Sequence, residues 1–546
     1  MSVSHAVRVY TARRILTMNA SVPVATHVAV REGRILGVGG AEVLREFGAV
    51  EIDDRYADKV LLPGFVEGHG HAVDGLMWRQ PYIGFYPRRA PDGTHVAGLK
   101  SIEAVVARLQ EVERGLDDPA APVIGWGFDP IFFDGRRMTA ADLDRVSSTR
   151  MVMVGHVSGH IQNVNTLVLE RAGFSRDSNL DGLVRDAGGE LTGELQGPAL
   201  MGRASRVVGD PGIMRAIDAP ALWDYARIAS RVGVTTSTDL SNGLGPASVA
   251  ALQEATGAEG FPLRLVPAMR QRDYSLAEGL ARIAELKALS TDKLRFGIVK
   301  ITVDGSIQGF TARLRWPGYH NGAPNGLWYV APDELGAIVA AYHEAGHHLH
   351  LHTNGDEASE LATEMVGRAV RLFPRADHRH TLQHCQMADA AIFRRMAEFG
   401  MCVNLFANHV WYWGEQHRAL TMGPTRAQRL DACASALAAG VPMGIHSDVP
   451  VTPLDPLFTA WCAVNRLTPA GRVLGAHERI TVAQALYAIT MGAAVTLKMD
   501  HLVGSIDVGK FADFAVLEED PYEVPVGALK DVGVCGTVVG GVPVVA

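Results

Sequence analysis

Two histidines close an apolar run near the start of the chain. The segment LLPGFVEGHGH, residues 61–71, ends in His69 and His71, which are separated by one glycine. On a strand, side chains two residues apart point to the same face, so both imidazoles could bind one metal ion. Imidazole ligands favour zinc or a similar divalent ion, which polarises carbonyl groups and activates water. The pair alone also fits two ordinary core or surface histidines.

Four further short apolar runs carry metal-competent side chains near their ends, namely Lys300, His352, His384 and Asp448. Random spacing would seldom supply such residues at the ends of so many successive strands, so we expect these four and the histidine pair to meet at one site. Each has an alternative explanation. Lys300 could pair with Asp304, His352 and His384 could be core histidines, and Asp448 could shape a turn.

The elements that must position these residues alternate between strands and helices. Helical stretches such as 275–289 and 332–346 separate short β-branched runs. Alternation of this kind predicts an α/β fold with a parallel sheet, and eight units predict closure into a (β/α)8 TIM-type barrel with its chemistry at the C-terminal strand ends. The eight expected strands lie at 61–71, 233–240, 263–269, 297–305, 347–355, 380–385, 401–407 and 441–448.

Three further regions flank or interrupt the barrel, which we place at residues 61–499. Residues 1–60 and 500–546 both contain short strands separated by glycine turns, and we expect them to combine into one small β-sandwich domain. The stretch from about 72 to 226 follows the first barrel strand and contains strand-like runs of its own. We interpret it as an insertion over the barrel mouth that shapes a substrate pocket.

Composition limits the partners of the chain. Its 546 residues have a formal net charge of −8 and no run of lysine and arginine, which argues against nucleic acid as a partner. Its apolar runs are too short to predict a membrane span, and no signal peptide is evident. The five cysteines lack CxxC pairs, as is typical of reduced thiols in a cytoplasmic protein.

Motifs throughout the chain resemble those of the metal-dependent amidohydrolase superfamily. The segments LPGFVEGHGH, VSGHIQNVN, VKITVDGS, HTNGD, RHTLQHCQ and HSDVPVTPLDPL occur in the order found in the branch typified by N-substituted formamide deformylase. The resemblance implies one or two zinc ions and a strand-four lysine that is carboxylated to bridge them. The first ion would be bound by His69, His71 and Asp448, and the second by His352 and His384, with Lys300 between them.

The resemblance and the chemistry of the ligands together predict an enzyme that hydrolyses a carbon–nitrogen bond other than a peptide bond. A divalent ion would lower the pKa of bound water from 15.7 toward about 7. Asp448 would act as the general base and return the proton to the departing nitrogen. The expected substrate is a small N-acyl, N-formyl or cyclic amide. The alternatives are hydrolytic deamination of an aromatic or heterocyclic amine, often with one metal ion, and a scaffold barrel without activity, against which the retained ligands argue.

Candidate substrate contacts come from the insertion and from two aromatic loops. His160 matches a family motif, and Trp316, Trp411 and Trp413 follow predicted strands, although packing beneath the insertion would also explain these aromatic residues. The resemblance also suggests a homodimer or a larger homo-oligomer. The chain departs from the family pattern at Gln383, at His446 and after the TGxL element, where Gly197 stands and Glu194 cannot be assumed to replace a carboxylate.

Overall fold

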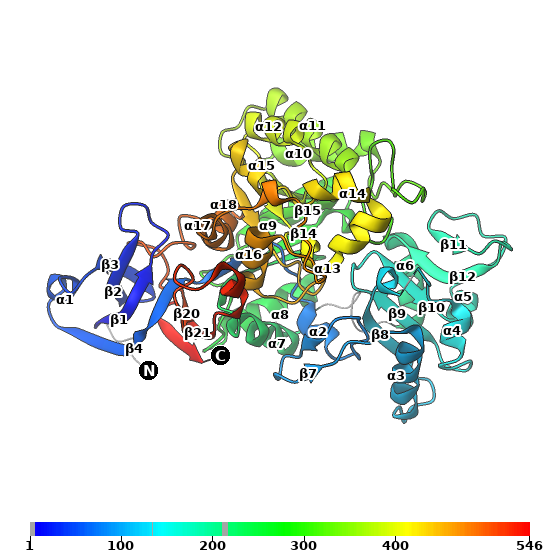
Figure 1. Cartoon of the computed structure of the whole chain (residues 1–546), viewed down its shortest axis with the longest axis horizontal. Coiled ribbons are helices and arrows are strands. Elements are labelled where there is room, and N and C mark those ends of the chain that lie inside the picture. The colour runs from blue at the N-terminus through cyan, green and yellow to red at the C-terminus, as the bar shows by residue number, and fades with distance from the viewer. Residues whose placement is uncertain (1–5, 134, 210–216, 546) are drawn as a thin grey trace.

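A parallel eight-stranded sheet forms the centre of the molecule (Figure 1). The computed structural model describes residues 6–133, 135–209 and 217–545. Seven parallel ladders join the strands in chain order, and each strand overlaps one of the eight predicted segments, as a TIM-type barrel requires. The strands are β5 (Phe65–Glu67), β13 (Val234–Asn242), β14 (Arg264–Arg270), β15 (Ile298–Thr302), β16 (His348–Thr353), β17 (Thr381–His384), β18 (Cys402–Leu405) and β19 (Met443–Ile445).

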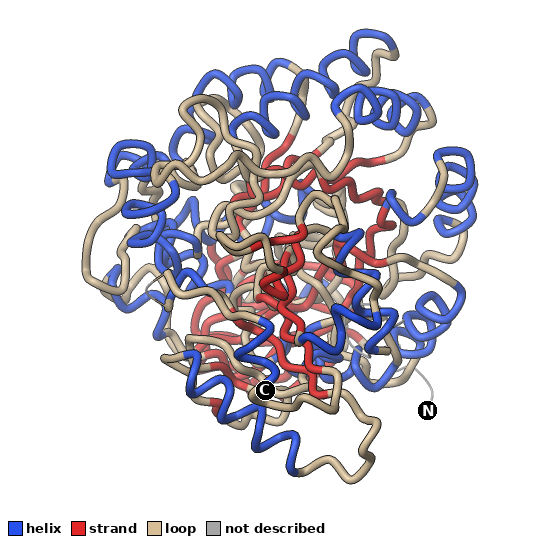
Figure 2. The backbone as a smooth tube through the Cα atoms, turned by 90° about the vertical axis from the view of Figure 1, so that its right-hand side faces the viewer, coloured by secondary structure: helices blue, strands red, loops and turns tan. Residues whose placement is uncertain are grey.

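Helices surround these strands on the outside of the sheet (Figure 2). Local sequence sets where they begin: Ser275 and Glu278 form a reciprocal capping box at the start of α9, and Pro332 opens α10. The apolar faces of helices and strands share one large core. The helices that follow or precede the strands include α7 (Ala219–Ser230), α8 (Pro246–Gly257), α9 (Leu276–Lys287), α10 (Pro332–Glu344), α11 (Asp356–Leu372), α12 (Ala390–Glu398) and α16 (Pro456–Asn465).

Both ends of the chain pair in a second sheet, at the left of Figure 1. Its strand order is β22-β21-β20-β4-β1-β2-β3, and β4 lies between β1 and β20. The two ends therefore combine in one seven-stranded ladder, and β1, β2 and β3 pack with β20 and β21 around a shared apolar core. The β-sandwich domain stays a prediction. The strands are β1 (Val7–Leu16), β2 (Val24–Arg31), β3 (Arg34–Gly39), β4 (Val50–Pro63), β20 (Phe514–Leu517), β21 (Val534–Val539) and β22 (Val542–Val545).

The segment between β5 and β13 contains a third sheet of five strands, at the right of Figure 1. Residues 134 and 210–216 of the predicted insertion lie outside the described residues. The strand order is β11-β12-β10-β9-β8, with helices packed on it. The elements are β8 (Val123–Phe128), β9 (Val152–His156), β10 (Ile161–Val164), β11 (Leu183–Arg185), β12 (Leu191–Gln196), α3 (Ile102–Arg114), α4 (Ala140–Asp144), α5 (Thr166–Arg171) and α6 (Pro198–Val208).

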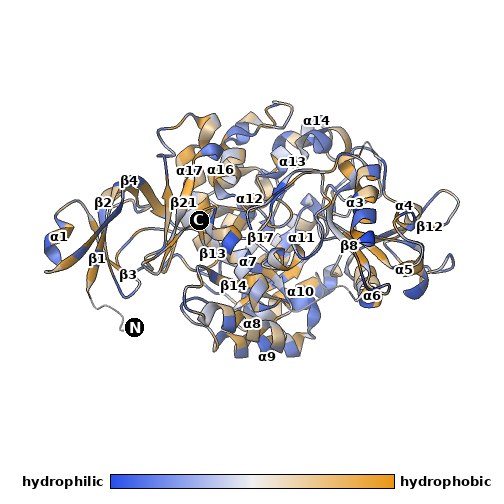
Figure 3. Ribbon diagram, turned by 90° about the horizontal axis from the view of Figure 1, so that it is seen from below, coloured by the Kyte–Doolittle hydropathy of each residue, from blue (hydrophilic) through white to orange (hydrophobic). Residues whose placement is uncertain are grey.

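The distribution of hydrophobic residues follows the arrangement of helices around the central sheet. In Figure 3 the outer helices α8 and α9 alternate hydrophobic and hydrophilic residues, as helices do that cover a sheet on one side and meet water on the other. Among the described helices, none combines the length and the apolar character that crossing a membrane would require.

Candidate metal centre

The C-terminal ends of the barrel strands bring the predicted ligands to one place. His69 and His71 follow β5, His384 is the last residue of β17, and Asp448 follows β19. Since the strands are parallel, these ends lie on the same side of the sheet. His384 and Asp448 have φ angles of 67° and 53°, a left-handed conformation that residues other than glycine seldom adopt. Such positions cluster at functional sites, where the surrounding structure enforces them.

His69, His71 and Asp448 form the first group of potential ligands. Asp448 Oδ1 lies 3.2 Å from His71 Nε2 and 3.4 Å from His69 Nε2. One donor atom from each residue falls within 4.8 Å of the other two. Asp448 Oδ1 has no hydrogen-bond partner among the described residues although it is buried. An unsatisfied buried carboxylate oxygen between two imidazoles fits a bound cation.

Lys300 lies beside this group. Its Nζ atom is 3.4 Å from His69 Nε2. Burial is the largest influence on the ammonium and lowers the pKa of Lys300 to about 7. The alternative pairing with Asp304 does not occur, because the Asp304 carboxylate instead accepts the backbone N–H groups of Asn354, Gly355 and Arg313. Lys300 is thus held next to the potential ligands without a structural ion pair in the described part of the chain.

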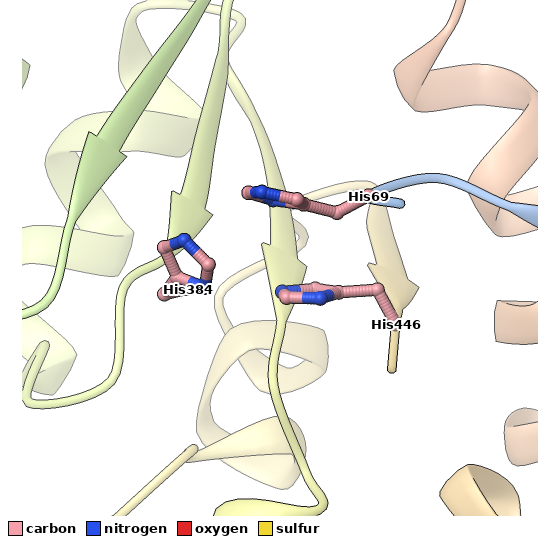
Figure 4. Close-up of side chains that lie close together, drawn as sticks. All are labelled: His69, His384 and His446. Atoms are coloured by element: carbon pink, nitrogen blue, oxygen red, sulfur yellow. The ribbon is translucent and has the colours of Figure 1, made fainter. Parts of the chain in front are cut away.

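His446 joins His69 and His384 in a second group (Figure 4). The His446 ring stacks on that of His69 with 4.6 Å between ring centroids, and the His384 ring lies 4.4 Å from His69. Both ring nitrogens of His384 and of His446 are buried and lack hydrogen-bond partners among the described residues. Burial keeps the pKa of all three histidines well below its usual range, so the rings are neutral and offer lone pairs.

A chain of buried polar groups fixes the tautomer of His69. The Gln383 Oε1 atom lies 2.7 Å from His69 Nδ1, and because an amide oxygen only accepts, Nδ1 carries the hydrogen. Gln383 Nε2 in turn donates to His350 Nδ1 at 2.7 Å, and His350 Nε2 donates to the Thr496 carbonyl at 3.0 Å. His69 therefore has a single nitrogen, Nε2, for a metal ion.

His352 stands at the margin of the centre. Its ring centroid is 4.5 Å from that of His384, but His352 Nε2 faces the Gly305 carbonyl at 3.3 Å. The predicted second pair, His352 and His384, is therefore adjacent, although one of its nitrogens is directed at the backbone. The His446 ring lies 4.6 Å from that of His69 and 5.0 Å from that of His384.

A cavity of about 740 Å³ opens above these side chains and is lined by His69, His71, Lys300, His352, His384 and Asp448. The insertion forms part of its wall through His160, which follows β9, and through α6. The His160 ring lies 5.1 Å from that of His352. Burial, followed by the charges of Arg272 and Lys300, lowers the pKa of His160 to about 3, so this ring is neutral at neutral pH.

The predicted aromatic contacts lie elsewhere. Trp316 is 95 % exposed, whereas Trp413 is buried and donates its Nε1 hydrogen to Asp129 Oδ2 at 2.9 Å. Trp411 packs against Tyr86 of the insertion. None of the three tryptophans is among the described residues that line the cavity, and a role for them as substrate contacts stays a prediction. Trp411 and Trp413 instead pack beneath the insertion.

Glu194 does not supply a carboxylate to the site. Its side chain is buried and accepts two hydrogen bonds from the Arg137 guanidinium, with Nε to Oε2 at 2.6 Å. Two cavity residues, Arg272 after β14 and Tyr329 in the loop after β15, carry no motif that would have identified them. The buried Glu67 at the end of β5 accepts the His69 backbone N–H.

Comparisons with known proteins cover almost the whole chain. The sequence profile described as Amidohydrolase family matches residues 57–545. YtcJ of Bacillus subtilis, named as an amidohydrolase, is 28 % identical over 94 % of this chain and 94 % of its own. N-substituted formamide deformylase of Arthrobacter pascens is 26 % identical over 97 % and 96 %, respectively. A metal-dependent hydrolase structure from Pyrococcus horikoshii has the same fold, with a TM-score of 0.70, 19 % identity and coverage of 96 % and 99 %.

Proposed function

Because the chain belongs to the amidohydrolase family, we propose that it uses divalent metal to hydrolyse a carbon–nitrogen bond in a small N-acyl, N-formyl or cyclic amide. The observation that carries the proposal is the meeting of His69, His71 and Asp448 beside Lys300 on the floor of a cavity. The similarity to a formamide deformylase over nearly the whole chain supports an amide as the substrate.

The residues present fit a metal ion. Asp448 Oδ1 and the ring nitrogens of His384 and His446 are buried polar atoms without hydrogen bonds in the described part of the chain, and a cation would satisfy them. His69, His71 and Asp448 would bind it, and imidazole-rich ligation favours zinc. When bound, the ion supplies Lewis acidity toward the amide carbonyl and lowers the pKa of water.

Asp448 is placed to move the proton in the reaction. Its carboxylate lines the cavity, where the oxygen that does not bind the ion can accept a proton from the attacking water. The same carboxyl then gives the proton to the nitrogen as the carbon–nitrogen bond breaks, so that amide and water become carboxylic acid and amine. The neutral His160 on the cavity wall would contact the substrate and position its carbonyl group.

Lys300 is proposed to be carboxylated. The neutral amine, favoured by burial, attacks carbon dioxide through Nζ and loses one proton, and the product is a carbamate anion with two oxygens. Such an anion beside His69 would supply ligands that the ammonium lacks. A second ion would then need His384 together with either His352 or His446.

One observation favours the alternative, hydrolytic deamination with one metal ion. Both groups of potential ligands include His69, and only its Nε2 atom is free, because Nδ1 binds Gln383. One nitrogen cannot bind two ions at once. Without a carbamate on Lys300, the centre would therefore hold a single ion.

Metal content and product analysis test the proposal. We expect metal-loaded protein to release an amine and a carboxylic acid from at least one member of a panel of formamides, acyl amides and cyclic amides. Release of ammonia from aryl or heterocyclic amines, with one metal equivalent, would establish the deaminase instead. The variant Asp448→Asn should remain folded and lose at least about 10³-fold in turnover. Near-normal turnover in that variant would remove Asp448 as the base.

A further inference from the structure

Arg272 on the wall of the cavity is a cation without an ion-pair partner among the described residues. Arg272 lies in the short turn Gln271–Asp273 after β14, at the catalytic end of the third barrel strand. Its side chain is accessible within the cavity and makes no ion pair or hydrogen bond with any described residue. Its neighbour Arg270 differs, since it pairs with Asp273 at 2.7 Å and also contacts the Ser241 carbonyl. The chain thus neutralises one of these two arginines and leaves the other open.

The Arg272 side chain is exposed to the cavity but partly enclosed by its wall, which reduces the hydration of the charge. Burial, followed by the charge of Arg270, lowers the pKa of Arg272, although a guanidinium remains charged. Arg272 lines the same cavity as His160, whose ring stands beside His352, and the charge of Arg272 contributes to the lowered pKa of His160. A partly desolvated cation gains most from an anion that arrives with the ligand.

The carboxylates of the cavity are already engaged. The lining contains the cations Arg206, Arg270 and Arg272, the amine of Lys300 and three carboxylates. Asp273 pairs with Arg270, and Asp448 belongs to the metal centre. Asp239 accepts hydrogen bonds from Asn242 Nδ2 at 2.8 Å and from the Ala72 backbone at 3.3 Å. No carboxylate of the described lining is left for Arg272, and a bound metal ion would add further positive charge.

We propose that Arg272 binds a carboxylate of the substrate, so that the natural substrate is an acidic amide, such as an N-acyl or N-formyl amino acid. The planar guanidinium offers two parallel N–H donors that match the two oxygens of a carboxylate. The carboxylate would lie against Arg272 on the wall while the amide reaches the metal centre on the floor. This inference rests on the proposed amide hydrolase function and specifies its substrate class.

A matched pair of substrates tests the role of Arg272. N-formyl-phenylalanine carries a carboxylate, and N-formyl-phenylalanine amide replaces it with a neutral group of the same size. We expect the enzyme to prefer the acid, and Arg272→Met to lower kcat/KM for the acid by about 100-fold, the loss typical when one partner of a charged pair is removed. Hydrolysis of the neutral amide should change by less than about threefold. Arg272→Lys retains the charge but lacks the paired N–H donors of the guanidinium. Its kcat/KM for the acid should therefore lie between those of the wild-type enzyme and Arg272→Met.

Arg206→Met is the control for general electrostatics, because Arg206 lines the same cavity from α6. The proposal for Arg272 would be overturned if Arg206→Met and Arg272→Met lowered kcat/KM equally, or if Arg272→Met lowered it equally for both substrates. It would also be overturned if the wild-type enzyme did not prefer the acid. Calorimetry separates this failure from that of the proposed function. In the Asp448→Asn background, N-formyl-phenylalanine should bind at least tenfold more weakly after Arg272→Met. If Arg272→Met does not weaken the binding of N-formyl-phenylalanine, the proposed carboxylate site is wrong. If binding weakens as expected but the protein hydrolyses no amide, only the proposed hydrolase function is wrong.

Discussion

At the residue scale, Gln383 determines how His69 can act. Its amide oxygen fixes the hydrogen on Nδ1 and directs Nε2 toward Lys300 and Asp448. A carboxylate at this position would orient the ring equally well but would add a negative charge. The neutral amide, supported by His350 and by Asn404 Nδ2 at 3.1 Å, orients the ligand without reducing the positive charge of the centre. A centre that keeps its positive charge in this way would favour an anionic substrate.

Replacement of Lys300 tests its bridging role. We expect Lys300→Ala to lose metal and activity, because no carbamate can form and the imidazoles lose an anionic neighbour. Bicarbonate with a short carboxylic acid such as propionate should restore part of both, since the acid can occupy the space of the carbamate. Metal analysis and turnover with and without propionate measure the effect, with the wild-type protein plus propionate as the control. Full metal content in the untreated variant would refute the bridging role.

His446 is expected to bind metal and not only to pack. The variant His446→Phe retains a ring that can stack on His69 but removes both nitrogens. We expect metal affinity to fall at least about tenfold, as is typical for residues close to a metal. Phe406, which stacks on the other side of His446 at 4.9 Å, provides the control. Phe406→Leu should leave affinity unchanged. Equal affinity in His446→Phe and the wild-type protein would reduce His446 to a packing residue.

Sequence reasoning at this scale predicted residues that closely follow apolar strands but not Arg272, which lies in a turn that no motif marks. His69, His71 and Asp448 were predictable because period-two spacing and an apolar run before them restrict where they can point. Arg272 lies in a turn, where no periodicity indicates a direction. The three tryptophans were placed at the cavity because their loops follow strands, yet the pattern cannot tell which side of a loop faces the cavity. Trp413 turns toward Asp129 of the insertion.

At the element scale, a buried ion pair joins the barrel to the sheet formed by the chain ends. Arg264 in β14 contacts Asp513, directly before β20, with Nε to Oδ2 at 2.6 Å and Nη2 to Oδ1 at 3.0 Å. Both side chains are 3 % exposed. Phe511 covers the guanidinium at 3.5 Å, and Gly540 donates its N–H to Asp513. The pair therefore fixes the two sheets relative to each other.

Removal of Asp513 should destabilise the protein strongly. The variant Asp513→Ala leaves the Arg264 charge buried without a partner, which typically costs about 3–5 kcal/mol. Urea denaturation measures the loss. Glu51→Ala is the matched control, because Glu51 forms an exposed ion pair with Arg8 that should contribute at most about 1 kcal/mol. Similar denaturation midpoints for the two variants would show that the buried pair does not couple the sheets.

The elements were predicted more fully than their pairing. All eight barrel strands were found because each is a short β-branched run followed by a helix pattern, and parallel pairing follows from that alternation. Register between distant strands is not encoded in the local pattern. Strand β4 pairs with β20 across most of the chain, as Leu61 with Val516 shows, and this pairing joins the strands of the two chain ends.

At the scale of the whole molecule, buried histidines gather at the end of the barrel away from the metal centre. His348 begins β16, and His378 and His380 precede β17. The His378 Nε2 atom donates to the Phe399 carbonyl at 2.6 Å, and His343 and His380 share a hydrogen bond of 2.8 Å. Burial lowers the pKa of His378 to about 4 and of His348 to about 3.

These histidines should make the fold sensitive to acid. An unfolded histidine takes up a proton below a pH of about 6.5, whereas folded His378 resists protonation until about 4. The contribution of His378 to stability is thus fully present above a pH of about 6.5 and is lost as the pH falls from about 6.5 to about 4. His378→Asn should reduce the loss of unfolding free energy between pH 7.5 and pH 5 by about 1–2 kcal/mol. Urea titrations at both pH values measure the slope.

A substitution of an exposed histidine provides the control for acid sensitivity. His477, whose side chain is 65 % exposed, should leave the slope unchanged when replaced by asparagine. Comparison within one pH series also cancels the contribution of metal release, which all variants share. An unchanged slope in His378→Asn would contradict the assignment of acid sensitivity to the buried histidines.

The place of β4 between β1 and β20 has a consequence for synthesis on the ribosome. The first strands emerge early, but the apolar edge of β4 around Leu61 and Leu62 stays open until β20 has been translated. An open strand edge is a template for pairing with other chains. Nascent or proteolysed molecules that lack β20 should therefore aggregate through β4, and translation of the final strands removes that hazard.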